Sequence, residues 1–129
     1  MRILGIDTTT RFLCLAFYDG VKIYEYNLEV GRRLSELIGV TLDRVLHALG
    51  WEPEDIDYFA CGIGPGSFTG MRVGVATVKG LAWGLKKPIA GIPTLDILAQ
   101  NVRADNNTHI IPVIDAKRSM VYYLSLIHI

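Results

Sequence analysis

The chain of 129 residues contains only two cysteines and three histidines, and it carries no net charge. Cys14 and Cys61 stand in apolar runs, and no second cysteine or histidine lies at metal-site spacing, which argues against a disulfide framework and a zinc motif. Thirteen basic residues balance thirteen acidic ones, so no global positive field attracts nucleic acid. Any RNA contact would therefore have to be local or shared with a partner.

Long hydrophobic segments are also absent. No apolar run reaches the roughly 18 residues that span a bilayer, and the first residues lead into a strand-like segment instead of a signal peptide. We therefore expect a cytoplasmic chain with no membrane contact. Half of the residues are hydrophobic, and a chain of this size buries about two-thirds of its unfolded surface. A packed core with surplus apolar surface is the expected result.

The pattern of apolar residues predicts a mixed α/β chain. Asp19-Gly20 is a hairpin turn between two strands, and the strand that follows it is expected to be half exposed. Apolar residues at three- and four-residue spacing predict the first helix, which ends at Gly50. The predicted elements are strands at 2–7, 12–18 and 21–28, a helix at 33–49, a strand at 56–63, a helix at 67–85, a strand at 89–90, a helix capped by Thr94 at 94–101, and a hairpin of 109–115 with 120–129.

The segment at 62–74, with the sequence GIGPGSFTGMRVG, is the most informative part of the chain. It lies between a predicted strand and a predicted helix, where phosphate-binding loops occur. It lacks the third glycine of the dinucleotide fingerprint, whose place is held by Ser67, and it lacks the glycine-lysine-hydroxyl ending of a P-loop. The glycines therefore do not define a nucleotide site.

Small residues recur on one side of the predicted second helix, at Gly70, Gly74, Thr77, Leu81 and Gly84. Such a stripe lets a second helix approach closely, and the rest of this helix is also mostly apolar. The stripe serves either the packing of helix on sheet within one chain or a partner chain. For a partner interface the candidate residues are Leu34, Leu37, Ile38, Leu42 and Val45 on the first helix and Phe68, Gly70, Met71, Val73, Gly74, Thr77 and Leu81 on the second.

Three segments together resemble the TsaB (YeaZ) family: ILGIDTTT at 3–10, GPGSFTGMRVG at 64–74 and IDAK at 114–117. Their order and spacing match across roughly residues 1–124. The resemblance implies the first lobe of an actin-like ATPase (ribonuclease H-like) fold over residues 1–105, with a mixed five-stranded sheet and helices on both faces. Residues 106–129 would be the first hairpin of a second lobe, so we expect a C-terminally truncated chain.

The resemblance also implies a function. Members of the family act as noncatalytic scaffold subunits in the synthesis of N6-threonylcarbamoyladenosine in tRNA, pairing with the catalytic subunit TsaD and with the ATPase TsaE, or as homodimers in isolation. TsaD-like relatives carry a metal-binding histidine pair at the places of Thr94 and Leu98, so we expect neither a catalytic residue nor a metal site here. No cofactor is required by this chain, and ATP or ADP is expected only at the assembled complex.

The first turn of the chain offers a competing interpretation. Asp7, Thr8, Thr9 and Thr10 resemble the first phosphate loop of actin-like ATPases, where hydroxyls and backbone N–H groups meet phosphate. Thr8 replaces the usual glycine, which favours a vestigial loop that now serves as a structural turn. The alternatives are a small actin-like ATPase that uses Asp7 and a glycoprotease-like hydrolase, for which the three scattered histidines form no motif.

Overall fold

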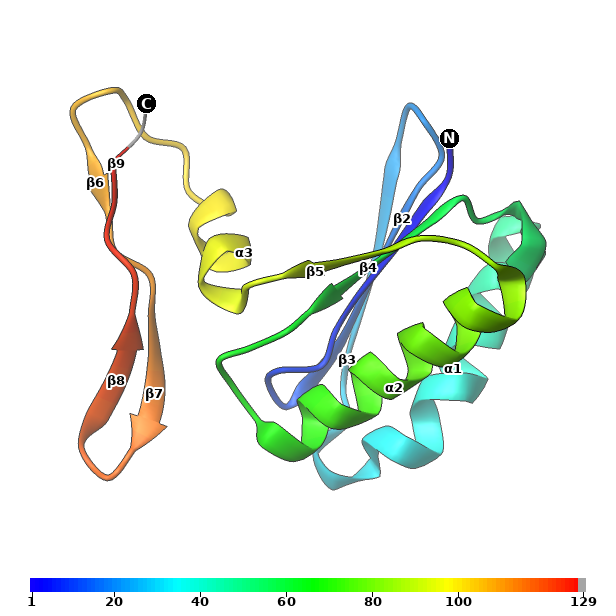
Figure 1. The fold of residues 1–129 in the computed structure, drawn as a ribbon, viewed down its shortest axis with the longest axis horizontal. Coiled ribbons are helices and arrows are strands. Elements are labelled where there is room, and N and C mark those ends of the chain that lie inside the picture. Colours follow the sequence, from blue (N-terminus) through cyan, green and yellow to red (C-terminus); the bar gives the residue numbers. More distant parts are fainter. Residues whose placement is uncertain (128–129) are drawn as a thin grey trace.

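The computed structural model describes residues 1–127. Its centre is a five-stranded mixed sheet with the strand order β3-β2-β1-β4-β5 (Figure 1). Pairing is antiparallel from β3 to β1 and parallel from β1 to β5. The strands are β1 (Ile3–Asp7), β2 (Phe12–Tyr18), β3 (Ile23–Glu29), β4 (Tyr58–Gly62) and β5 (Ile89–Ile92), and the helices are α1 (Leu34–Leu49), α2 (Phe68–Leu85) and α3 (Thr94–Gln100).

One face of the sheet carries the core, because side chains of a strand alternate between its two faces. Leu4 and Ile6 of β1 and Leu13, Leu15 and Phe17 of β2 are almost fully buried. Helices α1 and α2 cover this face (Figure 1). They bring apolar side chains at helical spacing into the same cluster, among them Leu34, Ile38, Leu42, Leu46, Val78 and Ala82.

The ends of the two long helices follow local sequence signals. The Ser67 hydroxyl accepts the N–H of Gly70 at 3.1 Å and so caps the N-terminus of α2. Gly50 ends α1 with φ at +68°, a left-handed conformation that glycine adopts without steric cost. The boundaries predicted for both helices are confirmed to within one residue.

Helix α3 lies on the other side of the sheet from α1 and α2 (Figure 1). Together with Gly5, Ala16 and Ala60 on that face of the sheet, it lines a pocket of about 460 Å³. Helices on both faces of the sheet are therefore confirmed. The prediction that Thr94 caps α3 is wrong, because Thr94 is already helical and its hydroxyl accepts the N–H of Gly64 at 3.1 Å.

The chain beyond α3 forms an interrupted hairpin that stands apart from the sheet (Figure 1). Its strands are β6 (His109–Ile110), β7 (Val113–Lys117), β8 (Met120–Tyr123) and β9 (Leu126–Ile127). β7 pairs with β8 and β6 pairs with β9, both antiparallel, which confirms the predicted hairpin. Residues 128–129 of its predicted second strand lie outside the described residues, and the domain boundary near 105 stays a prediction.

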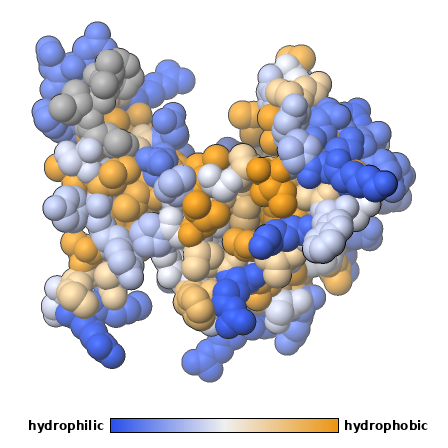
Figure 2. Space-filling model, in the orientation of Figure 1, coloured by the Kyte–Doolittle hydropathy of each residue, from blue (hydrophilic) through white to orange (hydrophobic). Residues whose placement is uncertain are grey.

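Hydrophobic surface is not confined to the core. Figure 2 shows hydrophobic side chains gathered around β5, in the middle of the molecule. β3 is also more exposed than the expected half-buried strand: Ile23 is 65% exposed, because β3 is an edge strand of the sheet. Among residues 1–127, no helix is both long and apolar enough to cross a membrane.

Candidate partner-binding site

The glycine-rich segment packs directly against the first turn of the chain. The pairs in contact are Gly62 with Asp7, Gly66 with Thr9, and Gly70 and Gly74 with Thr8. A Cβ atom on Gly62 would lie 2.7 Å from Cγ of Asp7, and one on Gly74 would lie 3.2 Å from Cβ of Thr8. No side chain larger than hydrogen fits without displacing the turn. These four glycines are thus explained by contacts within one chain.

Hydrogen bonds fasten the same turn to α2. The Asp7 carboxylate accepts the N–H of Thr9 at 2.8 Å and the hydroxyl of Thr9 at 2.6 Å. The Thr8 hydroxyl donates to the carbonyl of Gly70 at 2.6 Å, and the carbonyl of Thr9 accepts the N–H of Ser67 at 2.6 Å. Thr8 and Thr9 are both buried. Their hydroxyls are engaged inside the protein, as in a structural turn.

The last threonine of the turn lies at the surface. Thr10 is exposed, and its hydroxyl accepts the N–H of Phe12 at 3.2 Å. It borders a hollow of about 430 Å³ between the N-terminal ends of the two long helices, which Arg11 and Arg32 also line. The Arg11 side chain is paired with Glu29 at 3.2 Å. Of the four predicted loop residues, only Thr10 is exposed, and Asp7 is partly exposed.

The two cysteines lie near Asp7. Cys14 is the partner of Asp7 across the β1–β2 ladder, and Cys61 is the partner of Ile6 across the β1–β4 ladder. Burial, and next the Asp7 carboxylate, raise the pKa of the Cys61 thiol to about 11, and the same causes raise the pKa of Cys14. A raised pKa disfavours the thiolate, which is the reactive form of cysteine. Both thiols are unbridged.

Thr94 and Leu98, the two positions at which the resemblance implies histidines in TsaD-like relatives, differ in their exposure. Thr94 is 3% exposed and its hydroxyl holds the Gly64 loop, whereas Leu98, one turn later on α3, is 36% exposed. Across residues 1–127 no group of three or more histidine, cysteine or acidic side chains is placed to hold a metal ion. Because its hydroxyl accepts the N–H of Gly64, Thr94 connects α3 to the glycine-rich segment.

The interface residues predicted from the sequence divide into two groups. Leu34, Ile38, Leu42, Gly70 and Gly74 are buried inside this chain and so are not on its surface. The physical reason is that the regular apolar spacing marks the side of each helix that packs on the sheet and on the turn, not the outer side. The others reach the surface at least partly: Leu37, Val45, Met71, Val73, Thr77 and Leu81 are half-buried, and Phe68 is exposed.

The outward side of α2 carries a group of residues of which the sequence reasoning had singled out only Gly84, as part of the small-residue stripe. We call Ala76, Gly80, Trp83 and Gly84 the outer face of α2; all four are exposed, Trp83 by 86%. Gly80 and Gly84, like Gly39 on α1, have no atom within 4 Å of where a Cβ would lie. These glycines are not needed for packing within the chain, although glycine costs a helix about 1 kcal/mol relative to alanine. The signal in the sequence that could have indicated this surface was Trp83, which lies beside these glycines.

The strand order, the two helices on one face and α3 on the other define the first lobe of an actin-like (ribonuclease H-like) fold. Residues 28–128 match the family model described as "TsaD: tRNA N6-adenosine threonylcarbamoyltransferase". The solved structure of YeaZ from Pseudomonas aeruginosa superposes with a TM-score of 0.89 at 26% identity, covering 98% of this chain and 60% of that one.

Two curated relatives carry the same name, tRNA threonylcarbamoyladenosine biosynthesis protein TsaB. The Escherichia coli protein is 36% identical over 95% of this chain and 54% of its own length. The Bacillus subtilis protein is 35% identical over 95% of this chain and 53% of its own length. The chain belongs to the TsaD-like family and, within it, to the TsaB (YeaZ) proteins. It spans about half the length of these curated relatives.

Proposed function

We propose that this chain is a noncatalytic subunit in the synthesis of N6-threonylcarbamoyladenosine in tRNA and that it binds the catalytic subunit TsaD through the outer face of α2. The names of its relatives support the pathway. The observation that carries the proposed role is the pairing of a tryptophan that is 86% exposed with two open glycines on the same helix.

The chemistry of this face suits a helix of a partner protein. Gly80 and Gly84 let the backbone of a second helix approach closely, and Trp83 offers a large apolar side chain of the type that dominates binding energy at interfaces. Arg72 and Lys79 are exposed on the same helix, and the structure records no ion pair for either within residues 1–127. A partner surface with carboxylates around an apolar centre would complement both features.

The noncatalytic role is supported by what the chain does with its loop residues. The hydroxyls of Thr8 and Thr9 donate hydrogen bonds within the protein, and the hydroxyl of Thr94 accepts one. Thr94 stands at a position where the resemblance implies a metal ligand in TsaD-like relatives. Nucleotide and tRNA are then handled by the assembled complex, which TsaE joins. In the absence of TsaD, the same outer face is proposed to pair two copies of the chain.

Reconstitution of tRNA modification with TsaD and TsaE tests this proposal. Trp83→Ala should raise the concentration of this chain needed for half-maximal modification by about 30-fold or more, because a tryptophan hot spot contributes about 2 kcal/mol or more. Val21→Ala is the matched control, since Val21 is also 86% exposed but lies at the β2–β3 turn. If the two variants titrate alike, the outer face of α2 is not the partner site.

A further inference from the structure

The outer edge of β3 is an unpaired strand edge with few of the usual protections. β3 pairs with β2 along all seven of its residues and ends the sheet on that side. Edge strands commonly carry proline, lysine or a bulge that prevents association. β3 has no proline and no lysine, and its register with β2 is continuous from Ile23 to Glu29. Its backbone is therefore open to a further strand.

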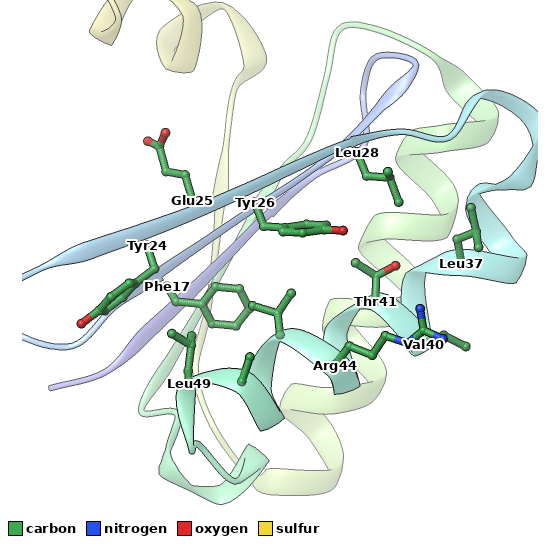
Figure 3. Close-up of a pocket in the computed structure, with 12 residues that line it drawn as sticks. Phe17, Tyr24, Glu25, Tyr26, Leu28, Leu37, Val40, Thr41, Arg44 and Leu49 are labelled. Atoms are coloured by element: carbon green, nitrogen blue, oxygen red, sulfur yellow. The ribbon is translucent and has the colours of Figure 1, made fainter.

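A groove runs beside this edge, between β3 and α1 (Figure 3). It measures about 410 Å³, and Tyr24, Tyr26 and Leu28 of β3 face it, opposite Leu37 and Val40 of α1. Tyr26 is 41% exposed and Val40 is 49% exposed, so the groove is unfilled. Its lining is mostly apolar, with Thr41 and Arg44 of α1 also bordering it. An added strand would place every second side chain in this groove, because strand side chains alternate between faces.

The charged and polar side chains on the other side of β3 restrict which strand can pair with its edge. Glu25 points away from the groove in Figure 3, and Asn27 and Glu29 share its side of the strand by the two-residue period. Glu29 already pairs with Arg11 at 3.2 Å. Glu25 and Asn27 are both exposed. A strand that sets an amide opposite Glu25 and a carboxylate opposite Asn27 would satisfy both.

β3 itself meets this requirement when it is turned around. In an antiparallel pair centred on Tyr26, Glu25 of each copy lies opposite Asn27 of the other, and Tyr24 lies opposite Leu28. Centring the pair on Glu25 would set Glu25 against itself, and centring it on Asn27 would set Glu25 against Glu29. Like charges directly opposite each other are destabilising. The Tyr26-centred register is the one that combines full overlap of β3 with complementary neighbours.

We propose that a second copy of this chain pairs with the β3 edge in this register, which joins the two five-stranded sheets into one and closes the two grooves over a pair of Tyr26 rings. This interface shares no residue with the outer face of α2. The two associations are therefore independent, and either can fail without the other.

Disulfide trapping tests the register. Directly opposite residues in an antiparallel pair have Cα atoms about 4.5–5.5 Å apart, which lies within the range that a disulfide spans. Tyr26→Cys should therefore give a covalent dimer under mild oxidation. Tyr24→Cys is the matched control, because the Cα atoms of the two copies of position 24 are about 14 Å apart in this register. No dimer from Tyr26→Cys, or equal dimer from both variants, would overturn the proposal.

A charge series at Asn27 provides the second measurement. It uses sedimentation velocity of chains that also carry Trp83→Ala, so that association through α2 does not contribute. Asn27→Glu sets like charges opposite each other twice and should weaken dimerisation about tenfold, whereas Asn27→Lys should strengthen it. Asn27 is exposed, so both variants are expected to fold. Equal dimerisation by the two variants would contradict the Tyr26-centred pair.

Discussion

Replacing Gly74 by alanine should destabilise the chain, although alanine is the better helix former. The added Cβ would lie 3.2 Å from both Cβ and Cγ2 of Thr8 and closer still to its hydroxyl oxygen. Thr8 is fully buried and cannot move aside freely. Overpacking of this kind costs about 1–3 kcal/mol. Loss of the hydrogen bond from Thr8 to Gly70 lowers the free energy of unfolding by about 1 kcal/mol more. The higher helix propensity of alanine offsets about 1 kcal/mol of this loss.

The net expectation for Gly74→Ala is a loss of about 1–3 kcal/mol in the free energy of unfolding. Gly80→Ala is the matched control on the same helix. Nothing lies within 4 Å of its added methyl group, so this variant should gain up to about 1 kcal/mol. Two identical substitutions, six residues apart on α2, are thus expected to change stability in opposite directions.

Urea unfolding followed by circular dichroism measures both values. A change of 1 kcal/mol corresponds to a shift of about 4 °C in Tm for a chain of this size, so thermal melts provide a second reading. Adding Thr8→Ala to Gly74→Ala should recover part of the loss, because it removes the atoms that the new methyl group meets. The reasoning is refuted if Gly74→Ala is neutral or stabilising, or if both glycine variants behave alike.

Two further outcomes follow from the turn and its surroundings. The unfolding free energy should fall as pH rises from 9 towards 11, because the unfolded chain loses the Cys61 proton near the ordinary pKa of 9.0 while the folded chain holds it to about 11. Urea titrations across this range should show the fall, and Cys61→Ala should reduce it, leaving the part that the raised pKa of Cys14 contributes. Thr94→Val should cost about 1–3 kcal/mol by leaving the buried N–H of Gly64 without its acceptor, whereas Thr94→Ser should be close to neutral in thermal melts.

Local signals predicted the elements of this fold well. Ser67 and Gly50 mark helix ends through hydrogen bonds to residues nearby in the chain, so the positions of α1 and α2 can be predicted from the sequence alone. Asp19-Gly20 likewise marks the turn between β2 and β3, where the Asp19 carboxylate accepts the N–H groups of Val21 and Lys22. Each of these interactions spans at most four residues, which is why the sequence reveals it.

The function of the glycines could not be predicted in the same way. Gly70 and Gly74 are small because of Thr8, which is 62 positions away from Gly70 in the chain. Gly80 and Gly84 look similar in sequence but face open space. The exposure of β3 is also non-local, since it depends on which strand ends the sheet. Whether a stripe of small residues on a helix faces the inside or the outside of the molecule could be decided only from the tertiary fold.

The binding of TsaD to the Gly80→Leu variant, measured by calorimetric titration, tests the central claim most directly. No atom lies within 4 Å of a Cβ added at Gly80, and Gly80 is exposed, so the variant should fold at least as stably as the original while holding a partner helix away from α2. We predict that its affinity for TsaD falls about 30-fold or more, with Val21→Ala unchanged. Unaltered affinity of the folded Gly80→Leu variant would contradict the assignment of the outer face of α2 as the partner site.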